Sequence, residues 1–328
     1  MIRPWPPLQN NWPGRCRWIC IGIISLCMAG MIAATAVAQA PSDMLKKDGP
    51  VADQEPITPI PAPPSADPLK LALGERLFSD KRLSGSGTLA CSSCHDIRSN
   101  GARPNGDTVS PPFDTLTVFN AVLSFRLNWE GNFRSPAAQL VSLLENPVNM
   151  RSSVADVIRK LNADPEIVDQ FRAAYGGEPD RERFLDAMVT FERSLVTPGS
   201  RFDRWLGGDR SALSEAELEG YRLFKSVGCS SCHQGVNVGG NLFERQGIFH
   251  PLVQRPPEIV RVPSLRNVAT TAPYFHDGSA ATLHDAVRRM AASQLDRTLT
   301  DQQVDSLVAF LRTLTGNYRG SPVVGAAP

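Results

Sequence analysis

Two identical pentapeptides, C-S-S-C-H, are the chemically most distinctive feature of this 328-residue sequence. They occupy residues 91–95 and 229–233. Two thiols at this spacing can bond to the two vinyl groups of one porphyrin, and the histidine that follows can present its imidazole to the iron. The sequence therefore predicts two covalently bound haem c groups. The expected attachment and ligand residues are Cys91, Cys94 and His95 for one haem, and Cys229, Cys232 and His233 for the other.

A C-x-x-C pair in an exported protein has two other common functions, a redox-active disulfide and half of a zinc site. Both are disfavoured here, because each pair is followed directly by histidine. Three of the seven cysteines lie within residues 1–38, and the other four are all used by the two pentapeptides. The odd total by itself does not fit a fully paired disulfide framework.

Residues 1–38 have the pattern of a signal peptide. Their three charged residues are all arginines, and an apolar run over residues 18–38 follows. Ala36 and Ala38 stand at the −3 and −1 positions of a cleavage site. An uncleaved membrane anchor is the alternative, since the run is long enough to span a bilayer. Either reading predicts export, with the periplasm as the location.

Residues 39–66 are rich in proline and contain no aromatic residue, which predicts a disordered, extended linker. A structured arm is the alternative. The formal net charge of the whole chain is only +1. That balance argues against the broad basic surface that nucleic acid binding requires, so no nucleic acid partner is expected.

The rest of the chain shows helical periodicity and no sustained strand alternation. The strongest patterns cover residues 181–196, with Asp180 as N-cap, and 301–314, with Thr300 as N-cap and Gly316 as the stop. Shorter helices are predicted at 153–161, 164–175, 214–225 and 282–292.

A shared G-x-R-L-F sequence, at residues 74–78 and 220–224, indicates a duplicated helix before each haem motif. We therefore predict a mainly α protein with two cytochrome c-like haem domains in tandem. The expected boundaries are 67–197 for the N-terminal domain and 198–328 for the C-terminal domain.

Around these motifs the sequence resembles the bacterial dihaem cytochrome c peroxidases, including the related methylamine-utilisation dihaem enzymes. The matching segments are LGERLFSDKRLSGSGTLACSSCHD (73–96), NWEGNFRSPAAQL (128–140), LVTPGSRFDRWLGGDRSALSEAELEGYRLF (195–224), GCSSCHQGVNVGG (228–240) and VPSLRNVATTAPYFHDGSAATLHDAV (262–287). The resemblance implies that the N-terminal haem meets hydrogen peroxide and that the C-terminal haem receives electrons from a small c-type cytochrome or a cupredoxin. It also implies a homodimer.

The resemblance assigns further residues to the site. Met290, 14 residues after His276, corresponds to the second iron ligand of the C-terminal haem. Trp129 corresponds to a tryptophan between the two haems, and Gln139 to a residue that hydrogen-bonds peroxide. Without the resemblance, Met290 and Trp129 would be read as core residues and Gln139 as a solvated helix position. An interdomain calcium ion is implied at Asp114 and the backbone carbonyls of Thr271 and Pro273.

Two departures from the family pattern bear on mechanism. No histidine occurs between His95 and His233, whereas many of these peroxidases carry one that caps the resting peroxidatic iron. The N-terminal haem is therefore expected to keep an open position at rest. Asn149 stands where the family has a distal glutamate, and an amide cannot carry the proton that peroxide cleavage requires. Glu145, one helical turn earlier, is the candidate replacement.

The leading hypothesis is a periplasmic cytochrome c peroxidase that reduces hydrogen peroxide to water. The alternatives are a dihaem oxidase that modifies a partner protein and a dihaem electron carrier without catalysis. Turnover of peroxide with a reduced cytochrome, with a protein substrate only, or with neither would distinguish the three.

Overall fold

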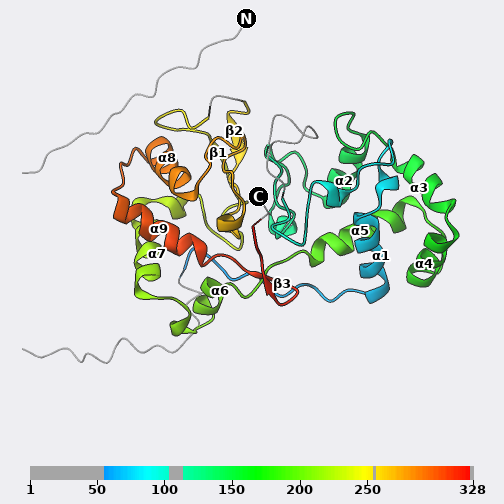
Figure 1. The fold of residues 1–328 in the computed structure, drawn as a ribbon, viewed down its shortest axis with the longest axis horizontal. Coiled ribbons are helices and arrows are strands. Elements are labelled where there is room, and N and C mark those ends of the chain that lie inside the picture. The colour runs from blue at the N-terminus through cyan, green and yellow to red at the C-terminus, as the bar shows by residue number, and fades with distance from the viewer. Residues whose placement is uncertain (1–54, 103–113, 254–255, 326–328) are drawn as a thin grey trace, which may run out of the picture. The chain divides into compact units, whose positions relative to one another are not determined.

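The structure is a computed structural model that describes residues 55–102, 114–253 and 256–325. The predicted signal peptide and residues 39–54 of the predicted linker lie outside this part of the chain. Within the described residues the fold is mainly α-helical, as predicted (Figure 1). No helix in these ranges has both the length and the apolar character needed to cross a bilayer.

The first half of the described chain contains five α-helices. They are α1 (Pro68–Phe78), α2 (Pro136–Glu145), α3 (Val154–Asn162), α4 (Pro165–Tyr175) and α5 (Arg181–Ser194). The N-cap predicted for α5 is confirmed, since the Asp180 side chain accepts a hydrogen bond from Arg183 N. The predicted helices at 153–161 and 164–175 are likewise confirmed as α3 and α4.

The second half contains four α-helices and two small sheets among its described residues. The helices are α6 (Arg201–Leu206), α7 (Glu215–Val227), α8 (Leu283–Leu295) and α9 (Asp301–Arg312). The strands are β1 (Phe243–Arg245), β2 (Ile259–Arg261), β3 (Asn317–Tyr318) and β4 (Ser321–Pro322), paired antiparallel as β1–β2 and β3–β4. Thr300 caps α9 as predicted, but this helix ends at Arg312, four residues before Gly316.

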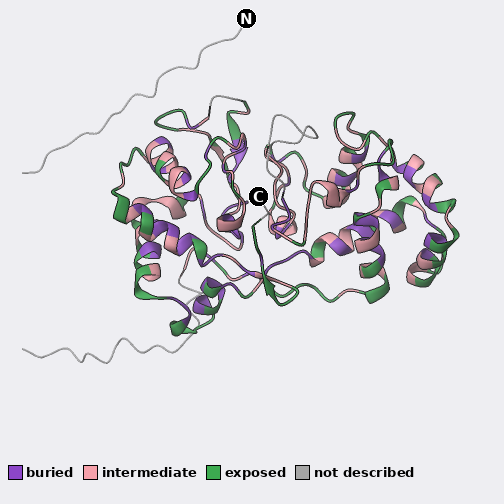
Figure 2. Ribbon diagram, in the orientation of Figure 1, coloured by how far each residue is buried: buried purple, intermediate pink, exposed green. Residues whose placement is uncertain are grey.

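The buried apolar side chains form two separate clusters. The first is built from α1 to α5 and spans Leu73 to Leu195, and the second is built mainly from α6 to α9 and spans Phe202 to Leu314. Buried residues accordingly occur in the helices of both halves (Figure 2). Each cluster also takes one residue from the opposite end of the chain. Ile57 packs into the second cluster, and Val323 packs into the first. The two terminal segments therefore cross, which the predicted domain boundaries did not anticipate.

The repeated G-x-R-L-F sequence has a packing explanation. Gly74 of α1 lies against the backbone of α5, where an added Cβ would be 2.2 Å from Ala187 O. Gly220 of α7 lies against α9, where an added Cβ would be 2.0 Å from Ser306 O. Only glycine permits backbones to approach this closely. Each half therefore uses the same tight helix pair, α1–α5 or α7–α9, to support its haem motif.

The prediction of a disordered linker is wrong for its C-terminal end. Ile57 is fully buried, and Glu55 accepts hydrogen bonds from Tyr221 Oη at 2.6 Å and Lys225 Nζ at 2.8 Å. The backbone also bonds to the second half, since Gly235 N donates to Pro56 O at 2.7 Å. The proline-rich composition predicted disorder, but a proline residue still offers its carbonyl oxygen as a hydrogen-bond acceptor. Two isoleucines supply the apolar surface that this arm buries.

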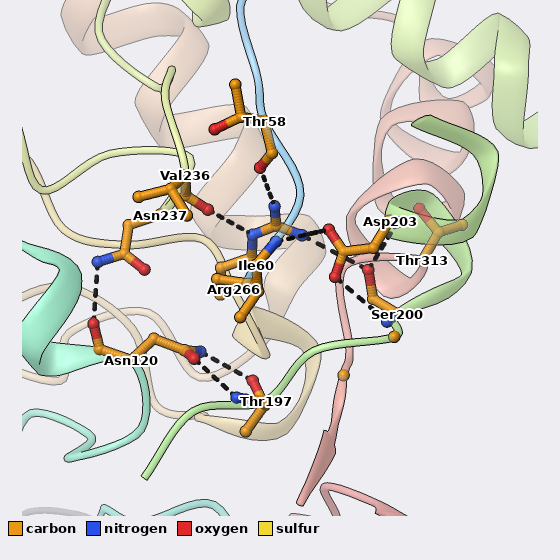
Figure 3. A network of polar contacts seen from close by, with 12 residues as sticks. Thr58, Ile60, Asn120, Thr197, Ser200, Asp203, Val236, Asn237, Arg266 and Thr313 are labelled. Carbon is orange, nitrogen blue, oxygen red and sulfur yellow. Dashed lines mark hydrogen bonds and ion pairs between the residues drawn. The ribbon is translucent and has the colours of Figure 1, made fainter. Parts of the chain in front are cut away.

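A buried polar network fixes the arm and the junction of the two halves (Figure 3). Arg266 pairs with Asp203 at 2.7 Å and donates to Thr58 O at 2.8 Å. At the junction, Thr197 Oγ1 accepts hydrogen bonds from the side-chain amides of both Asn120, at 2.8 Å, and Asn267, at 3.0 Å.

Candidate functional site

A single cavity of about 680 Å³ is lined by both C-S-S-C-H motifs. Its walls include Cys91, Cys94 and His95 from the first half, and Cys229 and His233 from the second. Most of the remaining lining is apolar and comes from helices α2, α7, α8 and α9 and from the loops between residues 114 and 129 and between 261 and 275. The fold therefore brings together the two sets of residues that the sequence predicted as haem attachment sites.

The two histidines have matching hydrogen bonds. The Nδ1 atom of His95 lies 3.1 Å from Gly101 O, and that of His233 lies 3.1 Å from Val238 O. An imidazole that donates from Nδ1 to a carbonyl keeps its Nε2 lone pair for a metal. Burial lowers the pKa of His95, and it lowers the pKa of His233 to about 4, so both rings stay neutral at pH 7. Both are thus prepared as iron ligands.

The cysteines fit neither a redox-active disulfide nor half of a zinc site. None of the four forms a disulfide, and burial raises the pKa of the Cys91 thiol to about 12 and that of the Cys229 thiol to about 11. A redox-active pair instead needs a thiol with a lowered pKa. Within the described ranges no group of three or more histidine, cysteine or acidic residues is arranged to hold a metal ion, so a zinc site is also unsupported.

These residues fit a covalent haem c at each motif. At each motif the cysteines directly precede a buried, neutral imidazole, and all of these residues except Cys232 line the mainly apolar cavity. Gly239 helps to shape the second site, since at a φ of 134° an added Cβ would lie 2.2 Å from Pro263 O. The residues present therefore suit the group that the motif implies.

The loops and helices over the cavity are also duplicated, beyond what the sequence analysis found. Asn120 and Asn267 both adopt left-handed backbone conformations and start 3₁₀ turns. The bridges Leu127–Phe133 and Tyr274–Ala280 then close equivalent loops. Helix α2 begins after Ser135 and helix α8 after Thr282, which keeps the same offset of 147 residues throughout.

This register pairs the predicted ligand and peroxide residues. Met290 of α8 corresponds to Leu143 of α2, and Gln139 of α2 corresponds to Ala286 of α8. All four line the cavity. The first half thus offers an amide and an aliphatic side chain where the second half offers a methyl group and a thioether.

Gln139 is held by a hydrogen bond within the first half, in which its Nε2 donates to Asn128 Oδ1. That contact fixes the amide orientation and leaves Oε1 as an acceptor.

Trp129 lies at the junction of the two halves. Its Nε1 donates to Asp114 O at 3.0 Å, and its ring lies edge-on to His276, its counterpart in the repeat, with centroids 6.1 Å apart. Arg261 N in turn donates to Trp129 O at 2.7 Å. The indole is therefore fixed from both halves.

The structure does not bring Glu145 to the cavity. Glu145 is the exposed last residue of α2 and lines a small surface pocket with Ala138 and Pro147. Helical periodicity explains this, because the cavity-facing residues of α2 are Gln139, Leu140, Leu143 and Leu144. Glu145 is therefore wrongly placed to replace the carboxylate that is absent at Asn149.

A different carboxylate, Glu192 of α5, does line the cavity. Burial raises the pKa of its carboxyl group to about 7, and in the described part of the chain that carboxyl group has no hydrogen bond or ion pair. It lies close enough to Cys91 for its charge to raise the pKa of that thiol. The sequence analysis missed Glu192 because it took the residue as part of an amphipathic helix, and only packing shows that it faces inward.

The residues of the predicted calcium site also lie around the cavity, namely Asp114, Thr271 and Pro273. The two segments are joined by a hydrogen bond from Asp114 N to His276 O at 2.7 Å. One carboxylate and two carbonyl oxygens are donors that suit calcium.

Comparison with known proteins agrees with this arrangement. The family described as di-haem cytochrome c peroxidase matches residues 68–211, and the family described as cytochrome c matches residues 218–315. The chain is 36% identical over 323 residues to the cytochrome c551 peroxidase of Nitrosomonas europaea, which covers 92% of each chain. It is also 36% identical over 269 residues to the cytochrome c551 peroxidase of Pseudomonas aeruginosa, covering 74% of this chain and 78% of that protein.

Among solved structures, a MauG-like protein associated with microbial copper homeostasis has a similar fold. Its TM-score is 0.66 at 28% sequence identity, and the match covers 78% of this chain and 93% of that one.

Proposed function

Because this chain belongs to the di-haem cytochrome c peroxidase family, we propose that it reduces hydrogen peroxide to water in the periplasm, with electrons from a small c-type cytochrome or a cupredoxin. It is an oxidoreductase with two haem c groups. The observation that carries the proposal is the single cavity lined by residues of both C-S-S-C-H motifs, by the amide of Gln139 and by the thioether of Met290.

When bound, the haem irons supply the electron transfer and the cleavage of the oxygen–oxygen bond. Which site would carry out each task depends on the other side chains that the two halves contribute to the cavity. Met290 offers a thioether to the His233 site, and combined histidine and methionine ligation raises a reduction potential. This supports the second half as the site that accepts electrons from the donor.

The first half offers no such ligand at the matching position. Leu143 cannot bind iron, so a haem held by His95 would receive no second protein ligand from this position and would have room for peroxide. Gln139, oriented by Asn128, is placed to hydrogen-bond the peroxide. An open first site and a closed second site are the basis of our proposed division of labour.

Reduction of peroxide to two waters consumes two protons, so the cavity needs a group that can hold one. Asn149 lines the cavity but cannot carry a proton, and Glu145 lies outside it. The Glu192 carboxyl group does line the cavity, and burial raises its pKa to about 7. We assign to the Glu192 carboxyl group the task of holding a proton near the first haem site.

The test is steady-state turnover of hydrogen peroxide by the holoprotein with a reduced small cytochrome c. We expect turnover, with none in His95→Ala. Consumption of peroxide only in the presence of a specific protein substrate would instead support the oxidase alternative. Absence of any reaction with peroxide would leave an electron carrier and contradict the proposal.

The calcium site at Asp114 is a further part of the proposal, as is the homodimer. Calcium bound by donors from residues 114 and 271–273 would join two segments of different halves. Chelation should therefore lower the melting temperature of the wild type and leave that of Asp114→Ala unchanged. An equal response of both proteins to chelator would contradict the site.

A further inference from the structure

Two buried arginines, Arg261 and Arg266, line the cavity and differ in how their charges are balanced. Arg266 is only 2% exposed and is fully partnered (Figure 3). Its guanidinium pairs with Asp203 and donates to Val236 O at 2.9 Å and to Thr58 O at 2.8 Å. The protein itself therefore neutralises this cation.

Arg261 is 6% exposed and has no carboxylate partner in the described part of the chain. Within residues 55–102, 114–253 and 256–325, its one side-chain hydrogen bond is from Nε to Asn128 O at 3.1 Å. Burial lowers the pKa of Arg261 to about 10, and no acidic group opposes this shift. Burial also lowers the pKa of Arg266, but there the negative charge of Asp203 opposes the shift.

The position of Arg261 is fixed from three sides. It is the last residue of β2, opposite Phe243 of β1. Its backbone N–H donates to Trp129 O, and its Nη1 atom lies near Gly240, where an added Cβ would be 3.6 Å away. The side chain is thus held at the cavity wall where the two halves meet, and among the described residues its Nη1 and Nη2 groups donate no hydrogen bond to protein.

A buried cation without a counter-ion is costly, and removing it from water is repaid only by a well-placed anion. The fork of a guanidinium matches a carboxylate in two-point geometry. The cofactor expected in this cavity carries such anions, because thioether attachment uses its vinyl groups and leaves its two propionate carboxylates free.

We propose that Arg261 binds a propionate carboxylate of one of the two haems, an inference that rests on the proposed dihaem function. The arginine would serve as an anchor that both halves hold. It would also place positive charge beside a haem, which favours the reduced over the oxidised iron.

The test compares three variants of the holoprotein by redox titration of both haems. Arg261→Gln removes the charge, Arg261→Lys keeps it, and Arg245→Gln removes an exposed charge from β1 of the same hairpin. We expect Arg261→Gln to lower the midpoint potential of one haem. Arg261→Lys should recover most of that shift, and Arg245→Gln should leave both potentials unchanged.

Resonance Raman bands of the propionate bending modes supply a second readout in the same samples, and they should move only in the Arg261 variants. Two unchanged potentials and unchanged propionate bands in folded Arg261→Gln would overturn the proposal, whatever happens to its melting temperature. Failure of the proposed function is separate, since it would show as absent peroxide turnover in the wild type.

Discussion

The two halves of the molecule share one scaffold, and the side chains that they place over the cavity differ in chemistry. Both pair a glycine-bearing helix with a second helix, α1 with α5 and α7 with α9, and both place a third helix, α2 or α8, over the haem site. On that third helix the first half has Gln139 and Leu143, where the second has Ala286 and Met290. Under the proposed function, these two exchanges are the ones that distinguish a site that reacts with peroxide from a site that relays electrons.

The strongest way to break this comparison is to remove the thioether. Met290→Leu makes the second half resemble the first, so its iron should lose its sixth ligand. We expect the potential of that haem to fall by on the order of 100 mV or more, because axial ligation sets haem potentials over a wide range. Potentiometric titration followed by visible absorbance measures the change.

Met150→Leu is the matched control, since this methionine also lines the cavity, on the side of the first half. Its potentials should equal those of the wild type. An unshifted potential in Met290→Leu would remove Met290 as a ligand.

The reverse exchange, Leu143→Met, makes the first half resemble the second. A thioether at this position should close the site opposite His95 and compete with peroxide. We expect turnover to fall roughly tenfold or more, equivalent to about 1.4 kcal/mol of competing ligation. Steady-state kinetics at saturating donor would show the loss, and Leu143→Ile, which adds no sulphur, should retain turnover.

The amide is tested next. Gln139→Ala gives the first half the side chain of Ala286, and the loss of one hydrogen bond to peroxide should reduce kcat/KM by roughly 3- to 10-fold. Glu145→Gln, on the outer surface of the same helix, should have wild-type kinetics. A larger loss in Glu145→Gln than in Gln139→Ala would contradict the placement of both residues.

The smallest expected effect concerns the proton. Burial raises the pKa of Glu192 to about 7, so its carboxyl group is largely protonated at pH 6 and ionised at pH 8. If the protonated form assists turnover, the wild-type rate should fall a few-fold as pH rises through this range. Glu192→Gln should lack that inflection, whereas Glu130→Gln should keep it. A wild-type profile that is flat between pH 6 and 8 would exclude this task for Glu192.

Much of the architecture follows from sequence alone. Apolar periodicity with an acidic or hydroxyl N-cap predicted α5 and α9, because those signals are local. Helix α2 was not predicted, although Ser135 and Pro136 are good start signals, since its apolar face is short. The docking of Ile57 depends on a partner surface formed by residues far along the chain, which composition cannot show.

The residues of the candidate site show the same contrast between local signals and long-range packing. The attachment residues are visible because their chemistry requires neighbours in sequence. Whether Glu145 or Glu192 faces the cavity depends on helix rotation, and whether a buried arginine is neutralised depends on residues such as Asp203, 63 positions from Arg266. These properties arise from tertiary packing and were therefore missed or wrongly assigned.

The central claim is that the first site is open and the second closed in the oxidised resting protein. An electron paramagnetic resonance spectrum of the holoprotein tests it most directly, because ferric haems with and without a strong sixth ligand give distinct signals. The account predicts one high-spin signal from the His95 site and one low-spin signal from the His233–Met290 site. Two low-spin signals would contradict it.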